Sequence, residues 1–211
     1  MGIKVTLYDF FAYTIPGGFY IATFVYLGVM LGFISIDAQI LESLSLSQII
    51  AFAIIAYVTG LILDPTSRPW YYRFFSKSFN QESLDDVNSW SSIKITTDPK
   101  SWAVLLMFIR VQENSISDSI ERYNATTIML RNISFSLLLS SMITLILIFQ
   151  TQFYFWNIAL CVILFCLSIL AGREAARFHR WFYQAMYQAI VAYGSEPADF
   201  LSKKKQVRKG K

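Results

Sequence analysis

Residues 133–149 of this chain read ISFSLLLSSMITLILIF and residues 157–171 read NIALCVILFCLSILA, with no charged side chain in either stretch. An α-helix rises about 1.5 Å per residue, and the hydrocarbon core of a bilayer is about 30 Å thick. At 17 and 15 residues the two stretches cover about 26 and 23 Å, most of that thickness, and together with their lack of charge they predict membrane spans at about Ile133–Phe149 and Asn157–Ala171. Residues 150–156 between them are rich in aromatic side chains, which settle at lipid headgroups, and predict a short turn between the spans.

Two more uncharged stretches occupy the first third of the chain. The first, about Phe10–Ile34, is long enough to cross a bilayer, and the second, about Gln48–Leu63, is shorter. We expect Asp64-Pro65 to end the second helix, because the residue before a proline disfavours helical geometry. The whole chain is 55% hydrophobic and 15% charged, whereas soluble domains carry about 25% charged residues. The sequence therefore predicts an all-α polytopic membrane protein with four transmembrane helices.

The positions of the basic residues predict the orientation of these helices. Of the 18 lysines and arginines, Lys4 precedes the first span, eight lie in residues 66–131 and nine follow residue 171. Residues 35–47 and 150–156 contain none. By the positive-inside rule, both termini and the segment between the second and third spans are expected in the cytoplasm. The expected location is the cell inner membrane, as a multi-pass protein, since buried helices of a soluble protein would give no reason for this separation.

This topology predicts four segments. Residues 1–65 hold transmembrane helices one and two, 66–131 form a cytoplasmic helical segment, 132–171 hold helices three and four, and 172–211 form a cytoplasmic helix extension and a basic tail. Residues 80–97 have few apolar positions and are interpreted as a loop. Asp98-Pro99 then predicts a helix start. Residues 112–119 either interrupt this helix or continue it into the third span. The fourth helix is expected to reach Tyr193, because no breaker precedes Gly194.

Small and polar residues within the spans predict where helices pack. Small residues four positions apart let two backbones approach closely in lipid, and a polar stripe is expected to face protein or water. Such a set fits helix packing inside one bundle, and it also fits an oligomer interface or a pore lining. Pro16-Gly17-Gly18 predicts a kink or break in the first span. The set comprises Gly28 and Gly32 in the first span, Ala56 and Gly60 in the second, and Asn132, Ser136, Ser140 and Thr144 in the third.

Three arginines directly follow the fourth span. Arg173, Arg177 and Arg180 are expected to contact anionic lipid headgroups or a partner. The spacing of Arg173 and His179 resembles the arginine-histidine signature of HEPN ribonucleases, which implies that arginine stabilises a phosphate while histidine transfers protons. The basic tail at residues 203–211 suits the anionic inner leaflet, and we do not expect direct nucleic-acid binding.

Residues for metal or cofactor chemistry are scarce. The chain has one histidine, and its two cysteines lie within an apolar span, where they pack as small hydrophobic side chains. It contains no phosphate-binding glycine loop and no nucleophile elbow. We therefore expect no metal, no cofactor and no enzymatic activity.

The layout of the chain has a family resemblance. The stretch YDFFAYTIPGG at residues 8–18, AYVTG at 56–60 and a long insertion before two further spans resemble the small four-span proteins of bacterial anti-phage loci. Membrane subunits of Kiwa defence systems are among these, and membrane accessory proteins of RNA-targeting CRISPR effectors look similar. The resemblance implies an inner-membrane homo-oligomer that works with a cytoplasmic protein partner.

Four functional hypotheses follow from the sequence. The first is a membrane sensor or scaffold of an antiviral system. The alternatives are an oligomeric pore or membrane-depolarising effector, a membrane-tethered HEPN-like ribonuclease, and a transporter. No charge inside a predicted span marks a substrate or proton path for a transporter.

Overall fold

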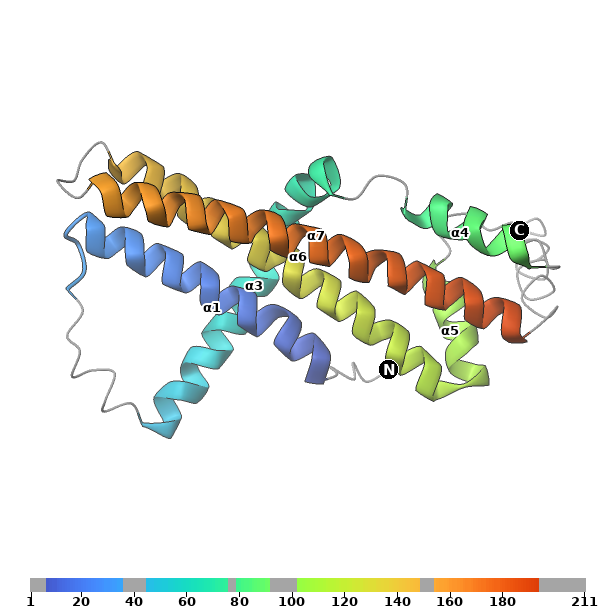
Figure 1. Cartoon of the computed structure of the whole chain (residues 1–211). Coiled ribbons are helices and arrows are strands. Elements are labelled where there is room, and N and C mark those ends of the chain that lie inside the picture. The colour runs from blue at the N-terminus through green and yellow to red at the C-terminus, as the bar shows by residue number, and fades with distance from the viewer. Residues whose placement is uncertain (1–6, 36–44, 76–78, 92–101, 149–153, 194–211) are drawn as a thin grey trace, which may run out of the picture. The chain divides into compact units, whose positions relative to one another are not determined.

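The computed structural model describes residues 7–35, 45–75, 79–91, 102–148 and 154–193, and these ranges contain six helices and no strand (Figure 1). The prediction of an all-α fold is confirmed. The helices are α1 (Leu7–Met30), α3 (Leu46–Phe74), α4 (Phe79–Trp90), α5 (Trp102–Gln112), α6 (Asn114–Ile148) and α7 (Tyr154–Tyr193).

Four of these helices are long and apolar enough to cross a membrane. They cover Phe10–Met30, Leu46–Phe74, Asn114–Ile148 and Phe155–Tyr193. Their outer faces expose large apolar side chains, which water would solvate poorly and lipid solvates well. In the most apolar 18-residue stretch of α6, 44% is buried within the chain, whereas the corresponding share in α3 is 11%. Helix α6 is therefore the more central of the two. The chain is therefore a multi-pass membrane protein.

The described residues group into two compact units. Unit 1 contains α1, α3, α6 from Ala125 onward and α7 up to Ala176. Unit 2 contains α4, α5, the first part of α6 and the last part of α7. Both units thus contain parts of α6 and α7, whereas the segments predicted from the sequence end at residues 65, 131 and 171.

Helices α1 and α3 approach closely in unit 1 because glycines lie where they meet. A Cβ atom on Gly17 would lie 1.7 Å from the carbonyl oxygen of Ala56, and one on Gly60 would lie 2.0 Å from that of Tyr13. A side chain at either position would hold the backbones apart. Helix α1 contains Pro16 and continues through it from Leu7 to Met30, so of the predicted kink or break the structure excludes the break.

The predicted end of the second span at Asp64-Pro65 was wrong. Helix α3 continues through Pro65 and Pro69 to Phe74. Side chains beyond Pro65 reach α6, since the Trp70 indole donates a hydrogen bond to the Ser134 hydroxyl (Nε1–Oγ 3.2 Å). These tertiary contacts outweigh the local preference of proline against helix.

The predicted loop at residues 80–97 was also wrong in its first part, because α4 occupies Phe79–Trp90. Its apolar residues are few, but Leu84 and Val87 are one turn apart and both are buried. Residues 92–101, which include the predicted helix start at Asp98-Pro99, lie outside the described residues. The following helix is confirmed as α5, Glu113 separates it from α6, and α7 reaches Tyr193 as predicted.

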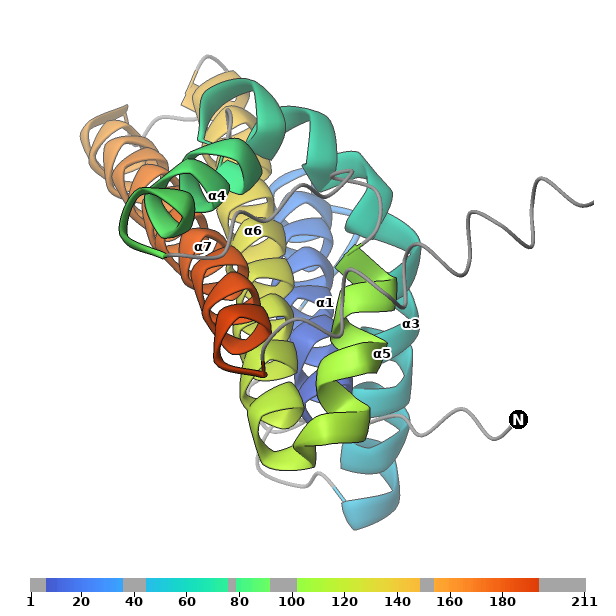
Figure 2. The same cartoon turned by 90° about the vertical axis from the view of Figure 1, so that its right-hand side faces the viewer.

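Unit 2 has its own apolar core, to which all four of its helical segments contribute side chains. Figure 2 shows the course of these four segments. The fully buried side chains Val87, Ile109, Ile120 and Met186 come from α4, α5, α6 and α7 respectively. Burial of side chains of this size stabilises a fold by about 1.5–3 kcal/mol each. Unit 2 therefore folds around an ordinary hydrophobic core, although two of its helices continue into the spans.

Candidate functional site

An acidic and a basic side chain meet in the interior of unit 1. Asp64 of α3 and Arg131 of α6 form an ion pair, with only 3% and 5% of each residue exposed. Charged groups are costly to bury and are tolerated when paired and hydrogen-bonded. This pair is the strongest candidate for a functional site, because ionisable residues buried among membrane spans are rare and usually serve a function.

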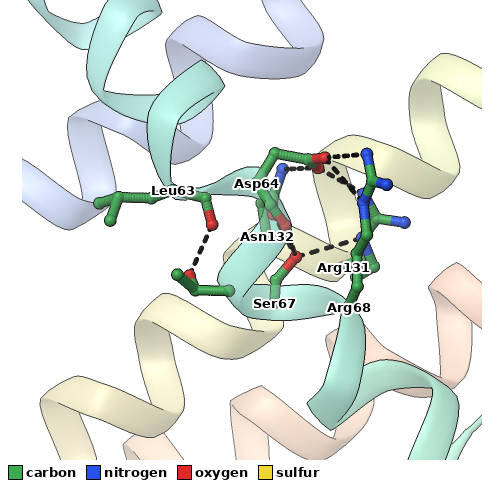
Figure 3. Close-up of polar contacts among 7 residues, drawn as sticks. Leu63, Asp64, Ser67, Arg68, Arg131 and Asn132 are labelled. Atoms are coloured by element: carbon green, nitrogen blue, oxygen red, sulfur yellow. Dashed lines mark hydrogen bonds and ion pairs between the residues drawn. The ribbon is translucent and has the colours of Figure 1, made fainter.

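Two neutral side chains complete the network around this pair (Figure 3). The Asn132 amide donates a hydrogen bond to Asp64 (Nδ2–Oδ1 3.0 Å), and Arg131 donates one to the Ser67 hydroxyl (Nε–Oγ 3.2 Å). The Ser67 hydroxyl in turn donates to Asn132 (Oγ–Oδ1 2.5 Å). Each of these polar groups therefore has a partner across the contact between α3 and α6, which such a buried network requires.

A second arginine binds the same carboxylate from the outer side. Arg68 follows Asp64 by one helical turn and donates from Nε (3.2 Å) and Nη2 (2.8 Å) to Asp64 Oδ2. Its side chain is 56% exposed, whereas that of Arg131 is 6% exposed. Asp64 therefore joins one buried and one accessible guanidinium, and the three charges leave one positive charge in surplus.

The network lies at about the same distance along α3 and α6 from one end of each helix. At about 1.5 Å per residue, Asp64 lies about 27 Å along α3 from Leu46, and Arg131 lies about 26 Å along α6 from Ile148. The hydrocarbon core of a bilayer is about 30 Å thick. The ion pair therefore lies where α3 and α6 leave their most apolar stretches.

The polar stripe predicted on the third span faces the interior of unit 1. Asn132, Ser136 and Thr144 are fully buried within the chain. The Ser140 hydroxyl lies 2.7 Å from that of Thr23 in α1. The stripe is therefore occupied by contacts inside a single chain.

Helices α6 and α7 are also joined by side-chain hydrogen bonds. Ser134 donates to the carbonyl of Ser168 (2.8 Å), and Ser168 donates to the carbonyl of Ser134 (2.7 Å). Farther along, Ser141 donates to the carbonyl of Cys161 (3.1 Å). Such bonds contribute about 0.6 kcal/mol each in membrane proteins and fix the register of the two helices.

The small residues of the sequence prediction occupy different environments. Ala56 and Gly60 lie at the close approach of α1 and α3 described above. Gly28 lies against Ile34, because a Cβ atom there would be 2.5 Å from Ile34 Cδ1. Gly32 follows the end of α1 with φ +75°, a conformation that glycine adopts without strain, and its N–H bonds to the carbonyl of Val29 (3.0 Å).

The three arginines after the fourth span do not share one environment. Arg173 belongs to unit 1 and is exposed. In unit 2, the Arg177 guanidinium lies 4.9 Å from the Trp181 ring centre, and Arg180 pairs with Glu82 of α4 (3.2 Å). Arg180 also lies 5.3 Å from the Phe79 ring, so α4 and α7 are joined by charge and by a cation–π contact.

His179 lies among aromatic rings in unit 2. Its ring centre is 5.9 Å from that of Phe79 and 5.1 Å from that of Tyr183. In the part of the chain that the structure describes, no group of three or more histidine, cysteine, aspartate or glutamate side chains could hold a metal ion.

Sequence reasoning missed the network of Asp64 and Arg131, because it placed both residues just outside the spans. A usable signal was present: Asp64 directly follows the second apolar stretch, and Arg131 lies two residues before the third. Opposite charges at matched ends of two spans can pair across them.

Comparison with known proteins identifies no relative, because no family model, curated protein or solved structure matches the chain. The class that fold and site define is a four-span membrane protein with a buried charge network and a second helical unit.

Proposed function

We propose that this chain is an integral inner-membrane component of a bacterial antiviral defence system, and that it acts as a membrane sensor or scaffold for a cytoplasmic partner. The antiviral part of the proposal rests on the resemblance of residues 8–18 and 56–60 to four-span proteins of anti-phage loci. The sensor or scaffold role is supported by the continuity of α6 and α7. Each helix supplies a membrane span to unit 1 and core residues to unit 2, such as Ile120 and Met186. A change in the spans is thereby linked to unit 2 through unbroken helices.

The charge network supports a role in signalling or anchoring. It ties α3 to α6, so the packing of one span constrains the helix that enters unit 2. The proposed orientation places both termini and unit 2 in the cytoplasm, as the distribution of lysine and arginine favours. Unit 2 is then the surface that a cytoplasmic protein would contact, and we propose that the complete assembly is a homo-oligomer.

Phage resistance in a host that carries the whole defence locus tests this function. We expect deletion of the gene to abolish resistance, measured as efficiency of plating, and a plasmid copy to restore it. A plasmid copy with Arg131→Ala is expected to restore it poorly, whereas Arg122→Ala, an exposed position on the same helix, should restore it fully. Unchanged resistance after deletion would contradict the proposal.

Partner binding is tested separately by affinity purification from detergent extract. We expect the wild-type chain to retain one protein encoded in the same locus. The double variant Arg177→Glu/Arg180→Glu reverses charge on the exposed part of α7 in unit 2 and should retain less of it. Because Arg180 also pairs with Glu82, the variant must keep the circular dichroism of the wild type for the loss to report partner binding. Capture of that protein in equal amounts by the wild type and the double variant would show that this part of α7 does not bind the partner.

The alternatives have less support from these contacts. The polar stripe on which the pore hypothesis rests is buried and hydrogen-bonded within one chain. Conductance of the purified protein in planar bilayers would support a pore. The ribonuclease hypothesis rests on Arg173 and His179, and RNA cleavage that is lost in His179→Ala would support it.

A further inference from the structure

Arg68 lies on the outer face of α3, among side chains suited to lipid. Leu61, Pro65, Arg68 and Tyr72 follow each other at intervals of three or four residues, so they form one stripe along the helix. All four are exposed in the chain, and Leu61 and Tyr72 are 47% and 50% exposed. A charged residue on such a stripe needs a polar partner from the membrane surface.

The Asp64 carboxylate holds the Arg68 guanidinium in place. Its Nε and Nη2 atoms both donate to Asp64 Oδ2, and Asp64 itself is fixed by Arg131 and Asn132. Arginine has five N–H donors, so three remain beyond these two bonds. A held guanidinium loses less side-chain entropy when it binds a second anion, which favours such binding.

The depth and charge of this group select the anion. Arg68 lies about 33 Å along α3 from Leu46, just beyond a hydrocarbon core about 30 Å thick. An α3 that enters the hydrocarbon at Leu46 and crosses it upright would place Arg68 at the lipid phosphates. The surplus positive charge of the two arginines over Asp64 attracts an anion, and a guanidinium fork matches two phosphate oxygens.

We propose that Arg68 binds the phosphate ester of an anionic phospholipid headgroup, held for this purpose by Asp64. A free phosphate ester has the same chemistry, but the lipid also contacts the apolar stripe formed by Leu61 and Pro65. The inference rests on the membrane assignment of α3 and is independent of any role in antiviral defence.

Native mass spectrometry of the detergent-purified chain tests the proposal. The protein is mixed with equal amounts of phosphatidylglycerol and phosphatidylcholine that carry the same acyl chains, so that only the headgroup differs. We expect the wild type to retain phosphatidylglycerol preferentially. Arg68→Gln should reduce the preference about tenfold, the effect of losing charge-assisted hydrogen bonds.

Arg73→Gln is the matched control, because Arg73 is an exposed arginine on the same helix and lies on a different face from Arg68. It should keep most of the preference. Arg68→Lys, which keeps the charge and loses the fork, should give an intermediate value and serves if Arg68→Gln loses helicity by circular dichroism.

Soluble glycerol phosphate separates the two sources of the anion. We expect it to displace phosphatidylglycerol only at a large excess. Equal displacement at equal concentration would mean that the lipid tails contribute nothing, and it would overturn the lipid assignment. An equal preference in the wild type and Arg68→Gln, or no preference in the wild type, would overturn the site itself.

Discussion

Asp64 and Arg131 are 67 residues apart in the sequence and form a buried ion pair between α3 and α6. Both helices are apolar enough to span a membrane, so the pair lies where few competing polar groups are available. Asn132 donates a further hydrogen bond to Asp64, and the Ser67 hydroxyl accepts one from Arg131. The pair therefore specifies how the second and third spans meet, and its loss has a predictable effect.

Removal of Arg131 should destabilise the protein strongly. Arg131→Ala leaves Asp64 buried with Arg68 and Asn132 as its remaining partners. Because Arg68 still neutralises the carboxylate, the expected cost is at most about 3–5 kcal/mol, the cost of removing one member of a buried pair. The free energy of unfolding in mixed micelles, measured by titration with sodium dodecyl sulfate, checks this.

Two comparisons make that measurement specific. Arg122→Ala removes an exposed arginine from the same helix and should change the free energy of unfolding by less than about 1 kcal/mol. The double variant Asp64→Leu/Arg131→Met removes both charges and should recover much of the loss, because apolar packing can replace a buried pair. A single variant as stable as the wild type would refute the role given to the pair.

The glycines of α1 give a second prediction, with its control next to it in the sequence. Gly17→Ala should lower the free energy of unfolding by about 1–3 kcal/mol, because its new methyl group meets the Ala56 carbonyl. Gly18 has no heavy atom within 4 Å of such a group, so Gly18→Ala should be neutral or stabilising. Equal stabilities of the two variants, measured by the same titration, would contradict the close approach of α1 and α3.

The apolar stretches predicted the four long helices because the need to bury or solvate about 20 apolar residues is a local property of the sequence. The extension of α3 beyond Pro65 was not predictable in this way. It depends on contacts with α6, such as that of Trp70 with Ser134, which pattern analysis of one segment does not contain. Helix α4 was missed for the same reason, since its two buried apolar residues, Leu84 and Val87, indicate a helix only when the core of unit 2 is known.

The candidate site was even less visible in the sequence. Asp64 and Arg131 each look like an ordinary charge at the end of a span, and only the depth of the two positions along α3 and α6 brings them together. The polar stripe was found from its spacing, but spacing alone left open whether it faces its own chain or another. The contact between Ser140 and Thr23 places it within the chain.

The core of unit 2 supplies a third prediction through two neighbouring residues of α5. Ile109 is fully buried and Met107 is 60% exposed, although both are large and apolar. Ile109→Ala should cost about 2–5 kcal/mol, and Met107→Ala should remain within about 0.5 kcal/mol of the wild type. Hydrogen exchange of the α5 amides, read by mass spectrometry, reports the local free energy of opening. Similar exchange in the two variants would argue against this core.

The final prediction concerns the orientation of the spans. In a background without Cys161 and Cys166, single cysteines are introduced at Ser35, which follows α1, and at Ser119 in α6, both of which are exposed. Since lysine and arginine are absent from residues 35–47 and abundant in 66–131, the positive-inside rule places Ser35 outside and Ser119 in the cytoplasm. A membrane-impermeant maleimide should label Ser35→Cys in intact cells and Ser119→Cys only after permeabilisation. Labelling of both variants in intact cells, or of Ser119→Cys alone, would mean that the distribution of charge does not set the orientation. It would also contradict the cytoplasmic placement of unit 2.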